Sequence, residues 1–532
     1  MGCYEGRGEC VFTDGVPDSF GMQLFPDDLD KLFPYLEKAI ERVPILETAG
    51  IKSVVNGPQP YTPDDLPIAG PAFGLKNFWL GEGNPNGVTL SGGIGWQLAE
   101  WIVEGAPSID MAACDPQRFG DFATRPYSMR KTEEAYERTY QIPLPGEELT
   151  ACRPLKTTPL HDILASRRAV FGSIYGWERP NWFAPDGVSP SEAYSFRTPS
   201  FTGHVRAECR AARSDMVLAD ISHGTKFRIH GTGLAAWLES RLTGYIPEPG
   251  RFGAAFLLTP AGTFRAALRL FREHPSSILV EGPPQAERAY LDALLRELDG
   301  VGSLRLDNIT GREGCLLLSG PASGDLLARL SRADITDKAA TDFGDAAFPA
   351  GTGRPVTVGY APVLAMRSDR FGFPGWELHC AAEYVRHVFL RLTEADADIR
   401  LIGARSLDAL RLADAEPGWG TELSMGWTLA ESGLGDGHAS RRLVLLAMRD
   451  PSSPAPFGEE PVYGPDGSMV GHTTSGGIDY TGDGYLAFAY VDALLSKPGM
   501  QFGILLLGKT YSAAVRERVG DPRNSTDRFT EE

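Results

Sequence analysis

A run of glycines near residue 90 has the residue types and spacing of a ligand-binding turn. Gly92, Gly93 and Gly95 stand directly before apolar residues at helical spacing, and this predicts a helix over 96–104 that Gly105 ends. A helix that starts on such a loop exposes unpaired backbone N–H groups and the positive end of its dipole, with almost no side chains in the way. This end could bind a planar ligand that carries partial negative charge. The alternative is a tight strand-to-helix turn.

Composition limits the class of protein. The chain has 532 residues, of which 42% are hydrophobic, and a net charge of -18. This length predicts about three or four domains, and the acidic balance without a basic cluster argues against nucleic acid. No apolar run reaches the about 18 residues of a membrane span, and the N-terminus lacks the apolar core of a signal peptide.

The numbers and spacing of cysteine and histidine residues favour a reducing compartment and argue against a metal site. The seven cysteines are dispersed without a Cys-x-x-Cys pair, which favours reduced thiols. The nine histidines do not have the spacing of a helical metal pair, so no metal site is predicted. We therefore expect a cytoplasmic enzyme that acts on a small molecule.

Hydrophobic periodicity predicts the elements that must position these groups. Helices are predicted over 26–43, 129–140, 286–298 and 383–392. Strands are predicted over 10–13, 51–55, 77–80, 443–448 and 503–507. Strands and helices alternate in the middle of the chain, which is typical of an α+β architecture. The short apolar runs near the end, separated by turns, are typical of a small β-barrel.

Three short stretches flank the glycines. Upstream lie Tyr61-Thr62-Pro63-Asp64-x-x-Pro67-Ile68-x-Gly70-Pro71 and Gly74-Leu75-Lys76-Asn77-Phe78-Trp79, and downstream lies Leu98-Ala99-Glu100-Trp101. In this order they resemble the end of the flavoprotein half of the dimethylglycine and sarcosine dehydrogenase family. In that family this helix N-terminus faces the pyrimidine end of FAD. The resemblance therefore implies that Gly87, Ser91, Gly92 and Gly93 line the flavin.

The family's FAD domain begins with a strand, a Gly-x-Gly-x-x-Gly turn and a helix that holds the pyrophosphate. Nothing in the first 80 residues resembles this unit. We expect that the chain lacks the dinucleotide-binding half, that it does not hold FAD tightly by itself, and that it is inactive alone. The chain is expected to be the C-terminal part of such an enzyme, either truncated or encoded separately, and in the second case a partner flavoprotein chain carries the missing half.

Motifs in the rest of the chain resemble the family's folate-binding half, which is similar to the aminomethyltransferase of the glycine cleavage system. They lie at 153–160, 171–183, 208–227, 375–379, 403–412, 419–423 and 460–491. The resemblance implies an α+β multidomain protein with four parts. These are the end of a D-amino-acid-oxidase-like FAD domain (1–119), a connector or middle domain (120–175), an aminomethyltransferase-like folate domain (176–422) and a C-terminal β-barrel (423–520).

A folate site needs a carboxylate, because a pterin presents an amino group beside a ring N–H that one carboxylate can accept in a planar, bidentate manner. The resemblance assigns this role to Glu377. Judged from the residues alone, a solvent-facing strand glutamate is the alternative. Ala267 stands where the family has an aspartate that assists attack by the folate nitrogen, and an alanine accepts no proton.

Three more departures fall in the same half. Arg370 beside Phe371 stands where the family often has an aromatic residue, and Glu416 replaces a further aromatic residue. The segment Lys-x-Asp-Phe-Ile-Gly is not recognisable within 423–442. These departures predict that methylene-tetrahydrofolate is not made by the family's mechanism.

The leading interpretation is FAD-dependent oxidative demethylation of a small methylated amine of the dimethylglycine or sarcosine type, with transfer of the carbon to tetrahydrofolate or its release as formaldehyde. No catalytic residue is assigned. Two alternatives remain: a non-catalytic folate-binding or scaffold subunit of a hetero-oligomeric flavoenzyme, and a folate-dependent methyltransferase.

Overall fold

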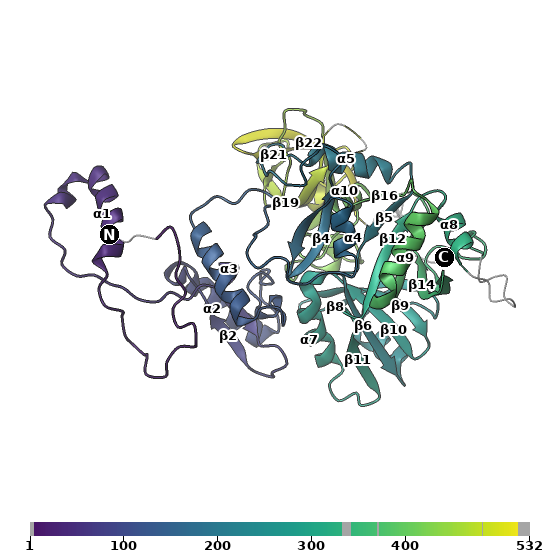
Figure 1. The fold of residues 1–532 in the computed structure, drawn as a ribbon, viewed down its shortest axis with the longest axis horizontal. Coiled ribbons are helices and arrows are strands. Elements are labelled where there is room, and N and C mark those ends of the chain that lie inside the picture. The colour runs from purple at the N-terminus through teal and green to yellow at the C-terminus, as the bar shows by residue number, and fades with distance from the viewer. Residues whose placement is uncertain (1–4, 332–341, 370–371, 481, 483, 520–532) are drawn as a thin grey trace.

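The computed structural model describes residues 5–331, 342–369, 372–480, 482 and 484–519. Figure 1 shows an N-terminal part that extends away from a larger body of sheets and helices. The helix α1 lies at the far end of this extension, and the strands of the C-terminal barrel lie at the top of the body.

The N-terminal part contains little regular structure. It comprises α1 (Leu29–Arg42), β1 (Ile68–Pro71), β2 (Trp79–Glu82) and α2 (Gly87–Glu104). The two strands form an antiparallel pair on which α2 packs, with Ala69 and Trp101 in a small core. No residue of α1 is buried.

The sequence predicted the helices of this part better than its strands. The predicted helix over 26–43 is confirmed as α1, capped by the Asp28 side chain at the Lys31 amide. The strands predicted at 10–13 and 51–55 are wrong, because both segments are irregular. An isolated apolar run becomes a strand only when a neighbouring strand pairs with its N–H and C=O groups.

A connecting region follows. It contains α3 (Arg125–Arg138), α4 (His161–Ser166), the hairpin of β3 (Ala169–Ile174) and β4 (Trp177–Phe183), and α5 (Thr202–Ala211). The Arg153 guanidinium forms two hydrogen bonds with buried Glu178 of β4, at 2.9 and 2.7 Å. This ion pair joins the segment after α3 to the hairpin of β3 and β4.

The body is built on two six-stranded sheets. The first has the order β11-β6-β10-β9-β8-β7, and the second has the order β13-β14-β15-β12-β5-β16. The strands of the first sheet are β6 (Thr225–Gly231), β7 (Thr243–Gly244), β8 (Phe252–Leu258), β9 (Phe264–His274), β10 (Ser277–Gly282) and β11 (Leu304–Asn308). Those of the second are β5 (Val217–Asp220), β12 (Glu313–Ser319), β13 (Gly353–Val358), β14 (Ala361–Arg367), β15 (Gly375–Ala381) and β16 (Arg400–Leu401).

Helices cover the outer faces of these sheets, and the inner faces meet. The helices are α6 (Leu234–Arg241) and α7 (Glu287–Glu297) on the first sheet, and α8 (Ser323–Leu330) and α9 (Ala382–Ala395) on the second. The helix α10 (Ala404–Ala413) packs against the opposite face of the second sheet, in a core that includes Leu317. Between the sheets, Phe271 and Leu279 pack with Met366 of the other sheet in a fully buried cluster. The helices predicted over 286–298 and 383–392 are confirmed as α7 and α9.

The C-terminal strands close into a barrel with the order β17-β20-β19-β18-β21-β22. They are β17 (Arg441–Met448), β18 (Pro461–Tyr463), β19 (Met469–Ile478), β20 (Tyr485–Asp492), β21 (Gln501–Leu506) and β22 (Lys509–Arg518), preceded by the short helix α11 (Leu429–Ser432). The predicted α+β architecture and the predicted barrel are confirmed. Among the described helices, none combines the length and the apolar composition that a bilayer span requires.

Glu422 joins the helix α10 to the barrel. It is fully buried. One carboxylate oxygen accepts hydrogen bonds from Thr474 (2.8 Å) and Ser475 (2.6 Å) of β19. The other accepts from Arg411 of α10 (3.0 Å) and from the Gly418 amide (2.8 Å). A single side chain thus links an α10 guanidinium, a loop and a barrel strand.

We predict that Glu422→Ala destabilises the protein by about 3–5 kcal/mol, because it removes the buried carboxylate from the Arg411 guanidinium and leaves only the partly exposed Asp408 as its ion-pair partner. Urea unfolding followed by tryptophan fluorescence measures this loss. Glu416→Ala is the matched control, because Glu416 lies six positions earlier and is exposed. Equal stability of the two variants would contradict the role of Glu422.

Candidate functional site

The predicted flavin residues lie at the start of α2, which begins earlier than expected. The helix starts at Gly87, with Asn86 as its N-cap, so the predicted start after Gly95 is wrong. Gly92 and Gly93 therefore lie within the helical hydrogen-bond ladder instead of a loop. Each glycine costs about 1 kcal/mol in a helix, but once a helix is nucleated every further residue adds one hydrogen bond.

The first turns of α2 still offer a bare surface. A Cβ atom built at Gly87, Gly92, Gly93 or Gly95 would meet no atom within 4 Å, and Ser91 is exposed. The first amides of the helix, at Gly87 and the next residue, have no intrahelical acceptor. This donor set fits one edge of a flavin ring, where the helix dipole favours negative charge. The roles of Gly87, Ser91, Gly92 and Gly93 stay a prediction.

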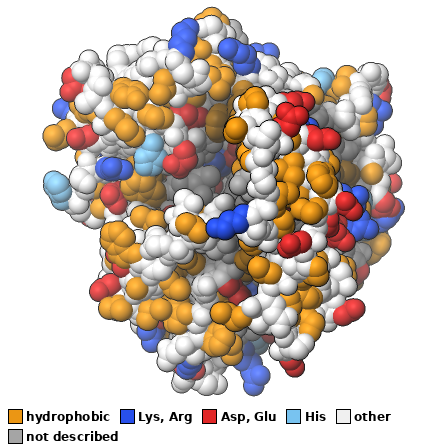
Figure 2. Space-filling model, turned by 90° about the vertical axis from the view of Figure 1, so that its left-hand side faces the viewer, with side chains coloured by type: hydrophobic (Ala, Val, Ile, Leu, Met, Phe, Trp, Pro, Cys, Tyr) orange, Lys and Arg blue, Asp and Glu red, His pale blue; other side chains and the backbone are white. Residues whose placement is uncertain are grey.

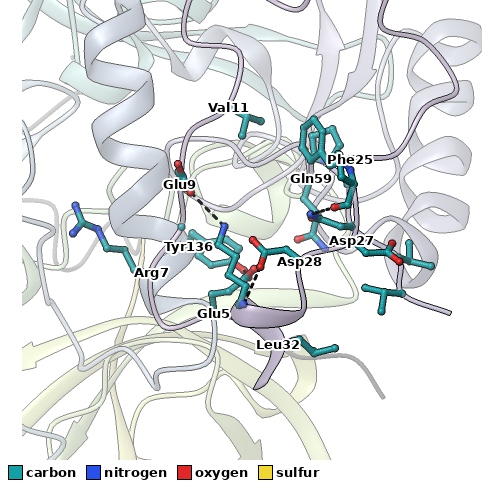
Figure 3. Close-up of a pocket in the computed structure, with 18 of the residues that line it drawn as sticks. Glu5, Arg7, Glu9, Val11, Phe25, Asp27, Asp28, Leu32, Gln59 and Tyr136 are labelled. Carbon is teal, nitrogen blue, oxygen red and sulfur yellow. Dashed lines mark hydrogen bonds and ion pairs between the residues drawn. The ribbon is translucent and has the colours of Figure 1, made fainter. Parts of the chain in front are cut away.

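A hollow in the N-terminal part carries no assembled chemistry. It has a volume of about 1560 Å³ and lies between the irregular residues 5–61 and α3. Lys31 is joined to Glu9 and Tyr136 donates to Glu5, whereas Arg7 and Asp27 point away from these pairs (Figure 3). None of the strongly buried titratable groups of the described residues lines the hollow.

Glu377 lies at the centre of the protein, on the inner face of β15. Its side chain is 1% exposed, so the alternative of a solvent-facing glutamate is wrong. One carboxylate oxygen accepts a hydrogen bond from Ser368 at 2.9 Å. The other is in a short ion pair with the Arg269 guanidinium of the facing sheet. The position assigned to the pterin carboxylate is thus buried, polar and already in contact with a cation.

Arg269 is the functional residue that sequence reasoning missed. It lies on β9 opposite Glu281 of β10, with 3.4 Å between Nη1 and the Glu281 carboxylate. Its guanidinium also lies over the Phe252 ring at 4.7 Å. Although burial opposes the charge, the carboxylates of Glu377 and Glu281 raise the pKa of Arg269. A signal was available, because the two-residue period of a strand places Arg269 on the same face as Ala267.

His379 and Cys315 complete this polar layer between the sheets. They are cross-strand neighbours on β15 and β12, with 3.4 Å between Nε2 and Sγ. The His379 Nε2 atom lies 3.5 Å from Glu281 and 4.0 Å from Glu377. Burial lowers the pKa of His379 despite these carboxylates, and burial raises the pKa of the Cys315 thiol. The imidazole is therefore neutral and the thiol is protonated at pH 7.

Cys315, Glu377 and His379 are close enough to share a metal ion, with ligand atoms within 4.8 Å of one another. The Arg269 guanidinium, however, already provides the positive charge at Glu377. A dication would have to sit beside that charge, which is unfavourable in a site of low dielectric constant. We therefore assign the cluster as an ion-pair network around Arg269.

The residues that depart from the family pattern were then located in the structure. Ala267 lies on β9, where its amide donates to the Tyr290 hydroxyl at 3.0 Å and its side chain offers no acceptor. Arg370 and Phe371 lie outside the described residues. Glu416 is exposed. No carboxylate therefore stands at the Ala267 position to assist a folate nitrogen.

Comparison with protein families divides the chain into three matched regions. Residues 104–158 match the FAD dependent oxidoreductase central domain. Residues 160–437 match the GCVT N-terminal domain. Residues 441–519 match the glycine cleavage T-protein C-terminal barrel domain. The predicted order of a partial FAD-oxidoreductase region, an aminomethyltransferase-like domain and a barrel is confirmed.

Curated relatives cover nearly the whole chain. Mouse dimethylglycine dehydrogenase is 32% identical, with 94% of this chain and 60% of the relative aligned. Human sarcosine dehydrogenase is 29% identical over 92% of this chain and 59% of the relative. The 4-methylaminobutanoate oxidase (formaldehyde-forming) of Paenarthrobacter nicotinovorans is 28% identical over 97% and 64%. The chain thus spans about 60% of the length of the first of these relatives.

A solved structure supports the fold of the body. The glycine cleavage system aminomethyltransferase T of Bartonella henselae superimposes with a TM-score of 0.57 at 19% identity. The match covers 71% of this chain and all of that protein. The two sheets and the barrel described above therefore form an aminomethyltransferase fold.

The buried neutral His379 predicts a pH dependence of stability. Its folded pKa lies below the ordinary 6.5, so the unfolded state takes up the proton first as the pH falls. Between pH 7.5 and 5.5 this costs up to about 1.4 kcal/mol of stability. Urea unfolding at both pH values should show that His379→Asn removes this loss.

The exposed His438 provides the control, because His438→Gln should keep the wild-type dependence on pH. If His379→Asn loses as much stability as the wild type on acidification, the neutral state of His379 is contradicted.

Proposed function

The chain belongs to the glycine cleavage T-protein family, in the branch of the dimethylglycine and sarcosine dehydrogenases, and on this premise we propose that it forms part of an FAD-dependent enzyme that oxidatively demethylates a small methylated amine. The observation that carries the proposal is the order of the domains. An FAD dependent oxidoreductase central domain at 104–158 is followed directly by an aminomethyltransferase domain at 160–437. The same order runs through relatives aligned over 94% of the chain.

The flavin would be held at one edge by this chain. Gly87 and the following amide of α2 would donate to the pyrimidine end of the ring, and the glycines behind them leave room for close approach. When bound, the flavin supplies the oxidation by accepting a hydride equivalent from the N-methyl carbon of the amine. The α2 dipole would stabilise the negative charge that the ring gains. The dinucleotide would be bound by the partner flavoprotein chain.

The oxidised carbon then has two fates. In transfer, a folate nitrogen attacks the iminium and a nearby base takes its proton. In release, water adds to the iminium carbon, the C–N bond breaks, and the products are formaldehyde, the shortened amine and a proton. Ala267 provides no base for transfer. We therefore propose release, which is the outcome named for the P. nicotinovorans relative.

The partner chain is supported by the surface of the N-terminal part. Most of the exposed large hydrophobic side chains of the described residues precede Met111. On α2 these include Trp96 (66% exposed) and Val103 (76% exposed). Figure 2, which looks onto the end of the molecule that carries this part, shows hydrophobic side chains over much of the face. Contiguous apolar surface of this kind marks a protein interface.

A non-catalytic scaffold subunit is the second candidate, because Ala267 and the Arg269–Glu377 ion pair remove two groups that folate chemistry needs. Both candidates predict the same partner. They differ in whether the assembled complex turns over a methylated amine.

Purification of the complex from its native source through a tag on this chain tests the proposal. We expect stoichiometric flavin absorbance in the complex, reduction of a dye by dimethylglycine or sarcosine, and one formaldehyde per amine oxidised. The chain expressed alone should lack flavin absorbance. A flavin-containing complex that oxidises neither amine would favour the scaffold role, and a complex without flavin would contradict both.

Substitution on α2 tests the proposed interface separately. Trp96→Asp and Val103→Asp should each reduce flavoprotein recovery in the tagged purification at least tenfold, because a charge replaces apolar contact area. Leu507→Asp is the matched control, since Leu507 is also half-exposed but lies in the barrel. Similar recovery for all three variants would exclude α2 from the interface.

A further inference from the structure

We propose that Arg269 is a specificity-determining residue that closes the carboxylate end of the aminomethyltransferase-like site. It serves as an internal ligand of Glu377 and thereby excludes a pterin. This inference deepens the proposed function, because it accounts for release of the one-carbon unit instead of its transfer to folate. It rests on contacts between β9, β10 and β15 that involve neither the flavin nor the amine.

The first step of the argument is the occupancy of Glu377. A pterin would need both carboxylate oxygens in one plane, to accept from its amino group and its ring N–H. Here one oxygen accepts from Ser368 at 2.9 Å, and the other is paired with Arg269 Nη1. Arg269 reaches Glu377 from the facing sheet and takes the position of an incoming donor.

The second step is that Arg269 is fixed in this position. Its backbone lies in the interior of the first sheet, in register with Glu281 of β10 on one side and Ala254 of β8 on the other. Glu281 binds the guanidinium from the same sheet at 3.4 Å, and the Phe252 ring stacks over it at 4.7 Å. A residue on a central strand has no hinge, so only side-chain rotation could free Glu377, and that rotation would break both contacts.

The third step is the balance of charge. Glu281 lies between two cationic residues on neighbouring strands, Arg269 on β9 and Lys226 on β6. Lys226 is fully buried and donates to the Ser222 and Gly224 carbonyls at 2.9 and 2.8 Å. Two cations therefore compensate the carboxylates of Glu281 and Glu377. The layer needs no external donor to neutralise Glu377.

Typical interaction free energies argue against displacement of Arg269 from Glu377 by a pterin. A hydrogen bond from a neutral ligand to a charged carboxylate is worth about 1.5–3 kcal/mol. Removing one partner of a buried ion pair costs about 3–5 kcal/mol. A pterin would have to displace the guanidinium and leave Arg269 beside Glu281 alone, so its two hydrogen bonds would be largely cancelled.

Binding of folinic acid, a stable reduced folate, to the full-length chain tests the inference by isothermal titration calorimetry. The wild type should show no saturable binding at millimolar ligand. The charge-matched double variant Arg269→Met with Glu281→Gln removes one cation and one anion together, and should bind at least tenfold more tightly. Adding Glu377→Gln to this variant should abolish the gain, because the uncovered carboxylate would provide the binding.

Arg265→Met with Glu297→Gln is the matched control. Arg265 lies on the same strand as Arg269, and Glu297 lies 3.8 Å from it, but neither contacts Glu377. This control should bind no better than the wild type. If circular dichroism shows that the double variant at Arg269 is unfolded, Arg269→Gln alone replaces it, with the same expected gain.

Saturable wild-type binding that Glu377→Gln abolishes would overturn the inference, and so would a folded Arg269 variant that gains no affinity. These outcomes need no flavin, partner chain or amine. Failure of amine oxidation in the native complex would therefore leave the result on Arg269 unchanged, and failure here would leave amine oxidation intact.

Discussion

Charged groups can lie between two packed sheets only if they compensate one another, and this constraint shapes the centre of the protein. A lone buried carboxylate would be protonated or would destabilise the fold. Here Glu377 faces Arg269 across the contact between the sheets, and Glu281 pairs with Arg269 from within the same sheet. The same ion pairs that stabilise the contact between the sheets also occupy the polar groups from which a ligand site would be built. Stability and ligand specificity are thus set by the same side chains.

The sequence predicted the body of the protein well, because its elements have strong periodicity. The α7 and α9 patterns were read within a few residues of their observed bounds. The prediction failed where tertiary pairing decides the outcome, as at 10–13 and 51–55, which have no strand to pair with. It also failed at the start of α2, where the helix continues through glycines that local propensity assigns to a loop.

The candidate site shows the same limit. The resemblance located Glu377, and the structure buries it, but no property of Glu377 alone indicates that Arg269 contacts it. These two residues lie 108 positions apart and on different sheets. The absence of a carboxylate at Ala267 was visible in the sequence, whereas the cation two positions later becomes meaningful only once the inner faces of the sheets are known to meet. Ion pairs between two packed sheets can be identified only once the fold is known.

The exposed apolar residues of the N-terminal part also affect how the protein is recognised by chaperones and proteases. Exposed apolar side chains and irregular backbone are what chaperones and proteases recognise, whereas the closed barrel presents no free sheet edge. Any copy whose N-terminal part is uncovered would therefore be attacked first within residues 5–110, and its barrel would resist longest.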